Sequence, residues 1–166
     1  MILGMSTANY TLIHVLISLV GIGSGLVVVF GFLRGKRLDG ITAIFLTTTA
    51  LTSITGFGFP FEHLLPSHIV GILSLAILAL AIPARYVFHL GDSWRWIYVV
   101  GSATALYFNV FVLVVQSFLK VSALHALAPT QKELPFLIAQ LTFLLIFATV
   151  TVFATIRFHP ERVHTA

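Results

Sequence analysis

Five long apolar stretches alternate with short polar segments along the chain. They cover residues 10–33, 40–59, 68–88, 94–119 and 135–158. Each is about 20 residues or longer, the length that an α-helix needs to cross about 30 Å of hydrocarbon. None alternates in polarity as a membrane-spanning strand does, and a helix satisfies its own backbone polar groups in lipid. The pattern predicts an all-α integral membrane protein, a bundle of five transmembrane helices in one domain over residues 1–166.

The composition agrees with this pattern. Hydrophobic residues make up 58% of the chain and charged residues 8%, whereas a soluble domain has about 25% charged residues. We therefore expect the lipid bilayer to surround most of the chain. Cysteine is absent, which excludes disulfides, thiolate metal sites and cysteine nucleophiles. The chain also has no motif of a soluble enzyme and no basic patch for nucleic acid, so neither an enzyme nor a nucleic-acid-binding protein is favoured.

Lysine and arginine are distributed unequally between the two sides of the predicted bundle. Lys120 and Lys132 fall on one side, and the rest of the nine basic residues fall on the other. The residues of that larger group are Arg34, Lys36, Arg37, Arg85, Arg95, Arg157 and Arg162. The positive-inside tendency places them in the cytoplasm, with the N-terminus outside and the C-terminus inside. The predicted location is a bacterial inner membrane.

The N-terminal stretch is predicted to be a retained helix, because it has no basic residue before Arg34 and no small-residue cleavage site. Trp94, Trp96 and Tyr98 are expected in an aromatic belt at the cytoplasmic interface. The long fourth loop, residues 120–134, is expected to contain a short interfacial helix.

Histidines gather on the predicted outer side. His14 lies about one turn inside the first helix, and His63 and His68 flank the second loop together with Glu62. Neutral imidazoles from two helices, His14 and His68, are suited to be the axial ligands of a b-type haem. Alternatively, His14, Glu62, His63 and His68 have the nitrogen and oxygen donors for zinc, copper or non-haem iron.

The helix face of His14 is predicted to point into the bundle. Gly21 and Gly25 stand seven and eleven residues after it, on the same face, and their spacing lets another helix approach closely. An inward histidine either binds something or hydrogen-bonds a neighbour. In the second case the expected partner is Gln116, Gln140 or a threonine, and the other outer histidines are ordinary loop residues.

Polar residues also occur inside other predicted helices. Thr48, Thr52 and Thr55 share a face that is suited to line a polar pathway, although a threonine in a membrane helix more often bonds its own helix carbonyl. Asn109 lies near the centre of the fourth stretch, where it is expected to hold helices together or to contact a substrate or cofactor.

On the cytoplasmic side, Arg85, His89, Asp92 and Arg95 flank a turn, and an anionic lipid headgroup is their expected partner. The chain is similar to small membrane b-type cytochromes in having histidines on more than one helix near one leaflet. This likeness covers no motif, and no residue role is carried over from it. Three functions remain open: a haem- or metal-binding protein that transfers electrons, an accessory subunit of a membrane complex or homo-oligomer without a site of its own, and a small transporter.

Overall fold

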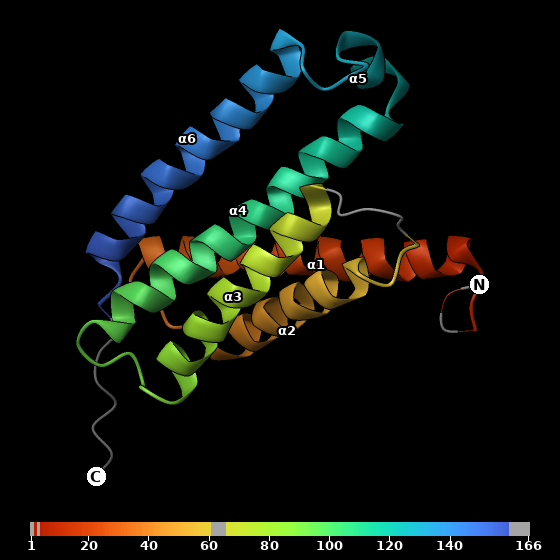
Figure 1. The fold of residues 1–166 in the computed structure, drawn as a ribbon. Coiled ribbons are helices and arrows are strands. Elements are labelled where there is room, and N and C mark those ends of the chain that lie inside the picture. Colours follow the sequence, from red (N-terminus) through yellow and green to blue (C-terminus); the bar gives the residue numbers. More distant parts are fainter. Residues whose placement is uncertain (1, 3, 61–65, 160–166) are drawn as a thin grey trace.

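The structure, a computed structural model, describes residues 2, 4–60 and 66–159, and within that part the chain is helical (Figure 1). The helices are α1 (Thr7–Leu33), α2 (Asp39–Gly56), α3 (Pro66–Tyr86), α4 (Trp94–Lys120), the short α5 (Ser122–Leu127) and α6 (Leu134–Arg157). An isolated bridge between Ile2 and Met5 is the sole extended pairing of the described residues. The five long helices match the five apolar stretches to within a few residues, and α5 confirms the short helix expected in the fourth loop.

Four of the helices are long and apolar enough to cross a membrane. They are α1, α4, α6 and the segment Ser67–Tyr86 of α3. Helix α2, with 18 residues, falls outside this group because Asp39 and its threonine and serine side chains lower its mean hydropathy. The fold is therefore a helical bundle with four candidate membrane spans. The fifth predicted span, α2, stays a prediction.

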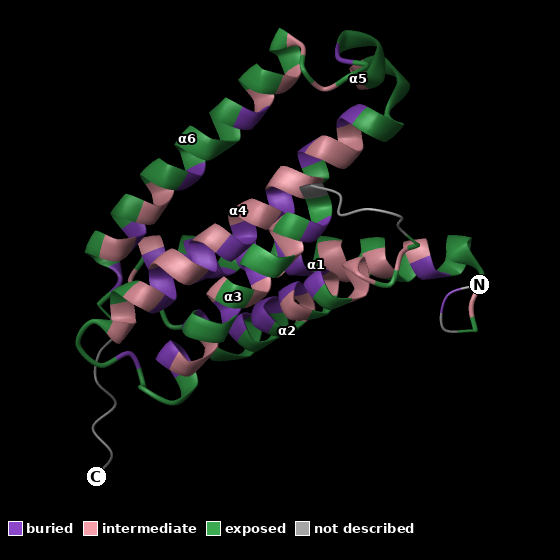
Figure 2. Ribbon diagram, viewed as in Figure 1, coloured by how far each residue is buried: buried purple, intermediate pink, exposed green. Residues whose placement is uncertain are grey.

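Helix α4 occupies the centre of the bundle and contacts α1, α2, α3, α5 and α6. Consecutive long helices run in opposite directions, so the beginnings of α1, α3 and α6 lie toward the same end as the last residues of α2 and α4 (Figure 1). We call this end the cavity end. The opposite end, which holds Arg34, Arg85, Arg95 and Arg157, is the basic end. Helix α6 packs mainly on α4 and, less closely, on α1, and most of it is exposed (Figure 2).

Two glycines let α1 approach α2 and α4 closely. A methyl group on Gly25 would lie 2.7 Å from carbon atoms of both Phe45 and Leu106, and one on Gly21 would lie 3.2 Å from the hydroxyl oxygen of Thr48. Both glycines are buried. The predicted inward face of α1 is confirmed, since a larger residue at Gly25 would overlap its neighbours.

The basic end is packed by aromatic rings from three helices. The ring centroid of Phe32 lies 5.3 Å from that of Tyr98 and 4.8 Å from that of Phe158, and all three side chains are buried. Of the three residues expected in an interfacial aromatic belt, Tyr98 is instead part of the core. Trp96 is exposed.

Arg85 explains why Tyr98 turns inward. Its side chain is 1% exposed, and its guanidinium donates to the Tyr98 hydroxyl at 3.2 Å and to the Asp39 carboxylate. Arg37 donates to the same carboxylate at 2.8 Å from the outside. This network ties the beginning of α2 to the end of α3 and the first turn of α4.

Arg95 is also bound within the bundle. It donates to the backbone carbonyls of Thr155 and Phe158, at 3.0 and 2.6 Å, where α6 ends. The expected lipid headgroup does not fit Arg85, because its side chain is 1% exposed and bound to Asp39 and Tyr98. For His89, Asp92 and Arg95 the lipid partner stays a prediction.

Candidate functional site

A cavity of about 640 Å³ lies between α1, α2, α3 and α4 at the cavity end. It begins where the contact between α1 and α4 ends, and the outer parts of these helices diverge from there. Its principal polar wall residues are His14 and Ser18 of α1, Thr52 of α2, His68 and Ser74 of α3, and Asn109, Gln116 and Lys120 of α4. Most of the remaining wall is apolar, and both its size and its composition are typical of small-molecule sites, which measure about 300–1,000 Å³.

His14 stands at the wall of this cavity in a defined orientation. Its Nδ1 lies 2.8 Å from the hydroxyl oxygen of Thr55, and the same oxygen lies 2.7 Å from the Leu51 carbonyl oxygen. With the Thr55 hydroxyl proton directed to Leu51, its oxygen accepts from Nδ1–H and the lone pair of the ring is on Nε2; with that proton directed to Nδ1, the tautomer is reversed. The edge of the ring also packs against Phe59, with centroids 5.2 Å apart. The threonine partner expected for an inward histidine is confirmed.

This arrangement also suits a ligand. A metal-bound histidine usually donates its second ring N–H to a protein oxygen, which fixes the ring and raises the basicity of the other nitrogen. The hydrogen bond to Thr55 is therefore compatible both with a purely structural role of His14 and with ligand binding by its other ring nitrogen.

His68 reaches the same cavity from the first turn of α3. It is 4% exposed, and its ring stacks on Phe57 with centroids 5.6 Å apart and planes 26° apart. The structure thus brings His14 and His68 to the walls of one cavity. Glu62 and His63 lie outside the described residues, and within the described ones no group of three His, Asp or Glu side chains is placed to hold a metal ion. Direct metal binding by His14, Glu62, His63 and His68 stays a prediction.

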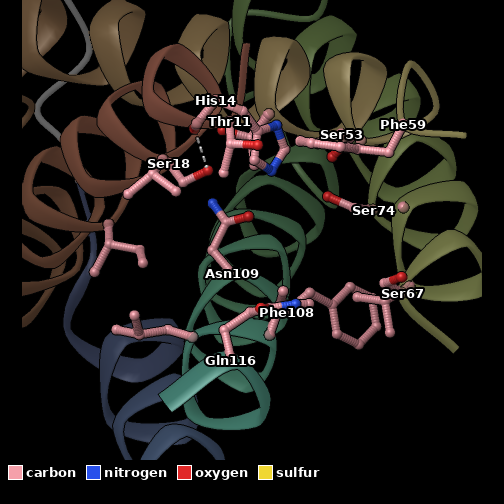
Figure 3. Close-up of a pocket in the computed structure, with 18 of the residues that line it drawn as sticks. Thr11, His14, Ser18, Ser53, Phe59, Ser67, Ser74, Phe108, Asn109 and Gln116 are labelled. Carbon is pink, nitrogen blue, oxygen red and sulfur yellow. Dashed lines mark hydrogen bonds between the residues drawn. The ribbon is translucent and has the colours of Figure 1, made fainter. Parts of the chain in front are cut away.

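Two hydroxyl groups at the cavity have no hydrogen-bond partner. They are Ser74 Oγ, on a side chain 2% exposed, and Thr52 Oγ1. Figure 3 shows Ser74 and Asn109 turned toward the same space as His14. By contrast, Thr48 and Thr55 donate to carbonyls of their own helix at 2.7 Å each. Thr48 and Thr55 thus bond their own helix, as expected for threonines in a membrane helix. Thr52 has a hydroxyl that is available to a cavity occupant.

The three remaining candidate residues differ in position. Asn109 donates to the Thr49 hydroxyl at 3.2 Å and so holds α4 to α2, as expected for an asparagine inside a membrane helix, while also bordering the cavity. Gln116 lines the cavity. Gln140 is on α6, away from the cavity walls, and donates to the Phe111 carbonyl at 3.3 Å.

Sequence reasoning missed Ser74 and Lys120 as wall residues. A signal for each was present. Ser67, Gly71 and Ser74 stand at i, i+4 and i+7 and form a small-residue face of α3. Lys120 follows Asn109 on α4 by eleven residues, three helical turns, and so continues a polar stripe.

Fold and cavity together define the class: a helical bundle with four candidate membrane spans and an internal, partly polar cavity at one end. No protein-family model, no curated protein and no solved structure matches the chain.

Proposed function

We propose that this protein crosses a bacterial inner membrane five times, with the cavity end outside. Helix α2 supports the fifth span because it packs along α1 in the opposite direction, so that a membrane crossed by α1 is crossed back by α2. Contact with α1, α3 and α4 buries Thr42, Thr49 and Ser53 of α2, which makes a lower mean hydropathy tolerable there. The exposed face of the helix carries Ile44, Leu51 and Ile54. The concentration of arginines at the basic end supports a cytoplasmic position for that end.

The natural absence of cysteine makes this topology testable by single-cysteine labelling. In intact cells, a membrane-impermeant maleimide should label Ser122→Cys at the cavity end. Lys36→Cys at the basic end should react only after the membrane is permeabilised. The reverse labelling pattern would overturn the orientation, and equal labelling of both positions in intact cells would overturn an odd number of spans between them.

We propose further that the cavity holds a cofactor ligated by imidazole, with a b-type haem as the first candidate. The observation that carries this proposal is the position of His14 at the cavity wall, where the contact of its Nδ1 with the Thr55 hydroxyl at 2.8 Å fixes the ring and leaves Nε2 as the nitrogen for a ligand. His68, on a different helix, supplies a second imidazole at the same cavity. Neutral imidazole is the usual protein ligand of a b-type haem, and a protein of this kind transfers electrons in the membrane.

A visible absorbance spectrum of the purified protein, before and after addition of haemin, tests the proposal. We expect a Soret band that shifts on reduction and that is lost in His14→Ala and in His68→Ala. His125→Ala, on the exposed α5, is the matched control and should keep the band. Elemental analysis of the same samples tests the direct metal site that also uses Glu62 and His63.

A transport role is the second candidate, and the unpartnered hydroxyls of Thr52 and Ser74 favour it. Absence of both a Soret band and a bound metal would reject the cofactor and leave the transporter and the accessory subunit.

A further inference from the structure

The cavity reaches the lipid-facing surface of the bundle on one side. Val15 and Leu19 of α1 and Leu113 of α4 line it, yet these side chains are 39%, 48% and 40% exposed. A residue that both borders a cavity and is exposed on an apolar helix face marks an opening of that cavity. The opening lies between α1 and α4 beyond their contact at Gly25 and Leu106, and in a bilayer it faces the acyl chains.

A positive charge stands at the rim of the same cavity. Lys120 is the last residue of α4, it is exposed, and no described carboxylate forms an ion pair with it. Asp39 and Asp92 lie at the basic end, and Glu133 is bound to Thr130 and to the backbone of Lys132. Within the described residues the cavity wall thus carries a cation and no carboxylate.

The cavity wall favours a mainly apolar occupant, and a hydrogen-bond acceptor in its deep part would add to binding without being required. Lys120 and Asn109 are eleven residues apart, which corresponds to a depth of about 16 Å along α4. The unpartnered hydroxyl of Ser74 faces the deep part, where a buried polar atom without a partner is unfavourable. An occupant that accepts a hydrogen bond from Ser74 removes that penalty.

We infer that the occupant is a lipid-soluble acid, which enters sideways from the bilayer between the outer parts of α1 and α4 and places its acidic group against Lys120. The inference deepens the proposed ligand site and rests on that site being occupied, but it does not require haem. Haem, a flat apolar ring with two carboxylates, belongs to this class, and so does a fatty acid.

The test compares acids with their esters in protein reconstituted into nanodiscs. The probes are haemin against haemin dimethyl ester and a fluorescent fatty acid against its methyl ester. We expect each bound acid to be favoured over its ester by about tenfold in affinity, the range of one charge-assisted contact. Lys120→Gln should abolish the preference, whereas Lys132→Gln, which changes a lysine away from the cavity wall, should leave it unchanged.

The outcomes separate this inference from the haem proposal. Haemin binding without an acid preference leaves the haem proposal standing and overturns the lipid-soluble acid. Fatty-acid binding that depends on Lys120, without haemin binding, supports the lipid-soluble acid and overturns the haem proposal. Binding of neither acid overturns both.

The sideways entry has its own readout. Leu113→Trp narrows the opening and should slow association of the fluorescent fatty acid, while Leu12→Trp, on the exposed face of α1 away from the cavity, should not. Equal association rates in the two variants would place the entrance elsewhere.

Discussion

The same four helices are packed differently at the two ends of the bundle. At the basic end, Phe45, Tyr98 and Leu106 have no exposed surface, and the guanidinium of Arg85 binds groups from two other helices. At the cavity end, the hydroxyls of Ser74 and Thr52 have no partner and a cavity separates the helices. Arg85 Nε and Ser102 Oγ also have no partner, but neither residue lines the cavity, whereas Ser74 and Thr52 do.

This difference predicts where substitutions should act on stability and where on the proposed binding. Helices α1 and α4 are closely packed at Gly25, and they diverge toward the cavity end (Figure 1). A binding cavity with unsatisfied groups lowers stability, so it needs a rigid part elsewhere to maintain its shape. We therefore expect substitutions at the basic end to change stability and those at the cavity end to change binding.

The largest effect is expected where the helices are closest. Gly25→Ala places a methyl group against Phe45 and Leu106, which have no free space around them, and should lower the free energy of unfolding by about 1–3 kcal/mol. Gly25→Leu should exceed this and prevent folding. Gly23→Ala is the matched control, because no atom lies within 4 Å of the added methyl group. Thermal unfolding in detergent measures both, and equal stability of the two alanine variants would contradict close packing at Gly25.

The ion pair of the basic end should have the next largest effect. Asp39→Asn keeps the size of the side chain but removes the negative charge that Arg85 binds, which should cost about 1.5–3 kcal/mol. Arg37→Gln removes only the exposed partner of the same carboxylate and should cost about 0–1 kcal/mol. If the two variants unfold at the same temperature, the ion pair between Arg85 and Asp39 does not stabilise the fold more than the exposed pair of Arg37 with Asp39.

Loss of one hydroxyl group compares the two ends directly. Tyr98→Phe leaves Nη1 of the buried Arg85 guanidinium without its acceptor and should cost about 1–3 kcal/mol. Ser74→Ala removes a hydroxyl that has no partner, so stability should change by less than about 0.5 kcal/mol. A destabilised Ser74→Ala protein would contradict the expectation that substitutions at the cavity end leave stability unchanged.

The smallest effect concerns the loop before α6. Slight desolvation raises the pKa of Glu133, but hydrogen bonds from the Thr130 hydroxyl and from the backbone of Thr130 and Lys132 outweigh it and hold this pKa below its ordinary value of 4.5. Because the folded loop prefers the carboxylate, its contribution is present above that value and is lost as the pH falls through the lower folded pKa.

Amide hydrogen exchange at Thr130 and Lys132 measures this change. After correction for the intrinsic rate, protection should decrease at acidic pH in the natural chain. Glu133→Gln should show low protection at every pH, and a pH-dependent protection in that variant would assign the titration to another group.

The helices and the contact face of α1 were predictable from sequence because they follow from local order along the chain. An apolar stretch ends where charges, glycines or prolines begin, as at Gly56 to Pro60, and residues three or four positions apart share a face in any helix. The inward direction of His14 followed from the Gly21 and Gly25 spacing in this way. Its partner could be narrowed to a glutamine or a threonine, and no further.

The partners of the polar side chains could not be read in the same way, because they lie far apart in sequence. Arg85 resembles an interfacial arginine until Asp39 and Tyr98 come beside it, 46 and 13 positions away. Thr52 and Thr55 look alike in the sequence. They differ in the structure because the Thr55 hydroxyl turns to Leu51 and His14, whereas Thr52 faces the cavity.

The sequence by itself determined that this chain is helical and apolar, since both properties depend on side-chain hydropathy and local spacing. Only the tertiary structure decided that one end of the bundle is closed and the other open. The reason is geometric: the angle at which α1 crosses α4 depends on the contact of Gly25 with Phe45 and Leu106, which come from three helices. A cavity is the space left by such an angle, and no single segment of the chain encodes it.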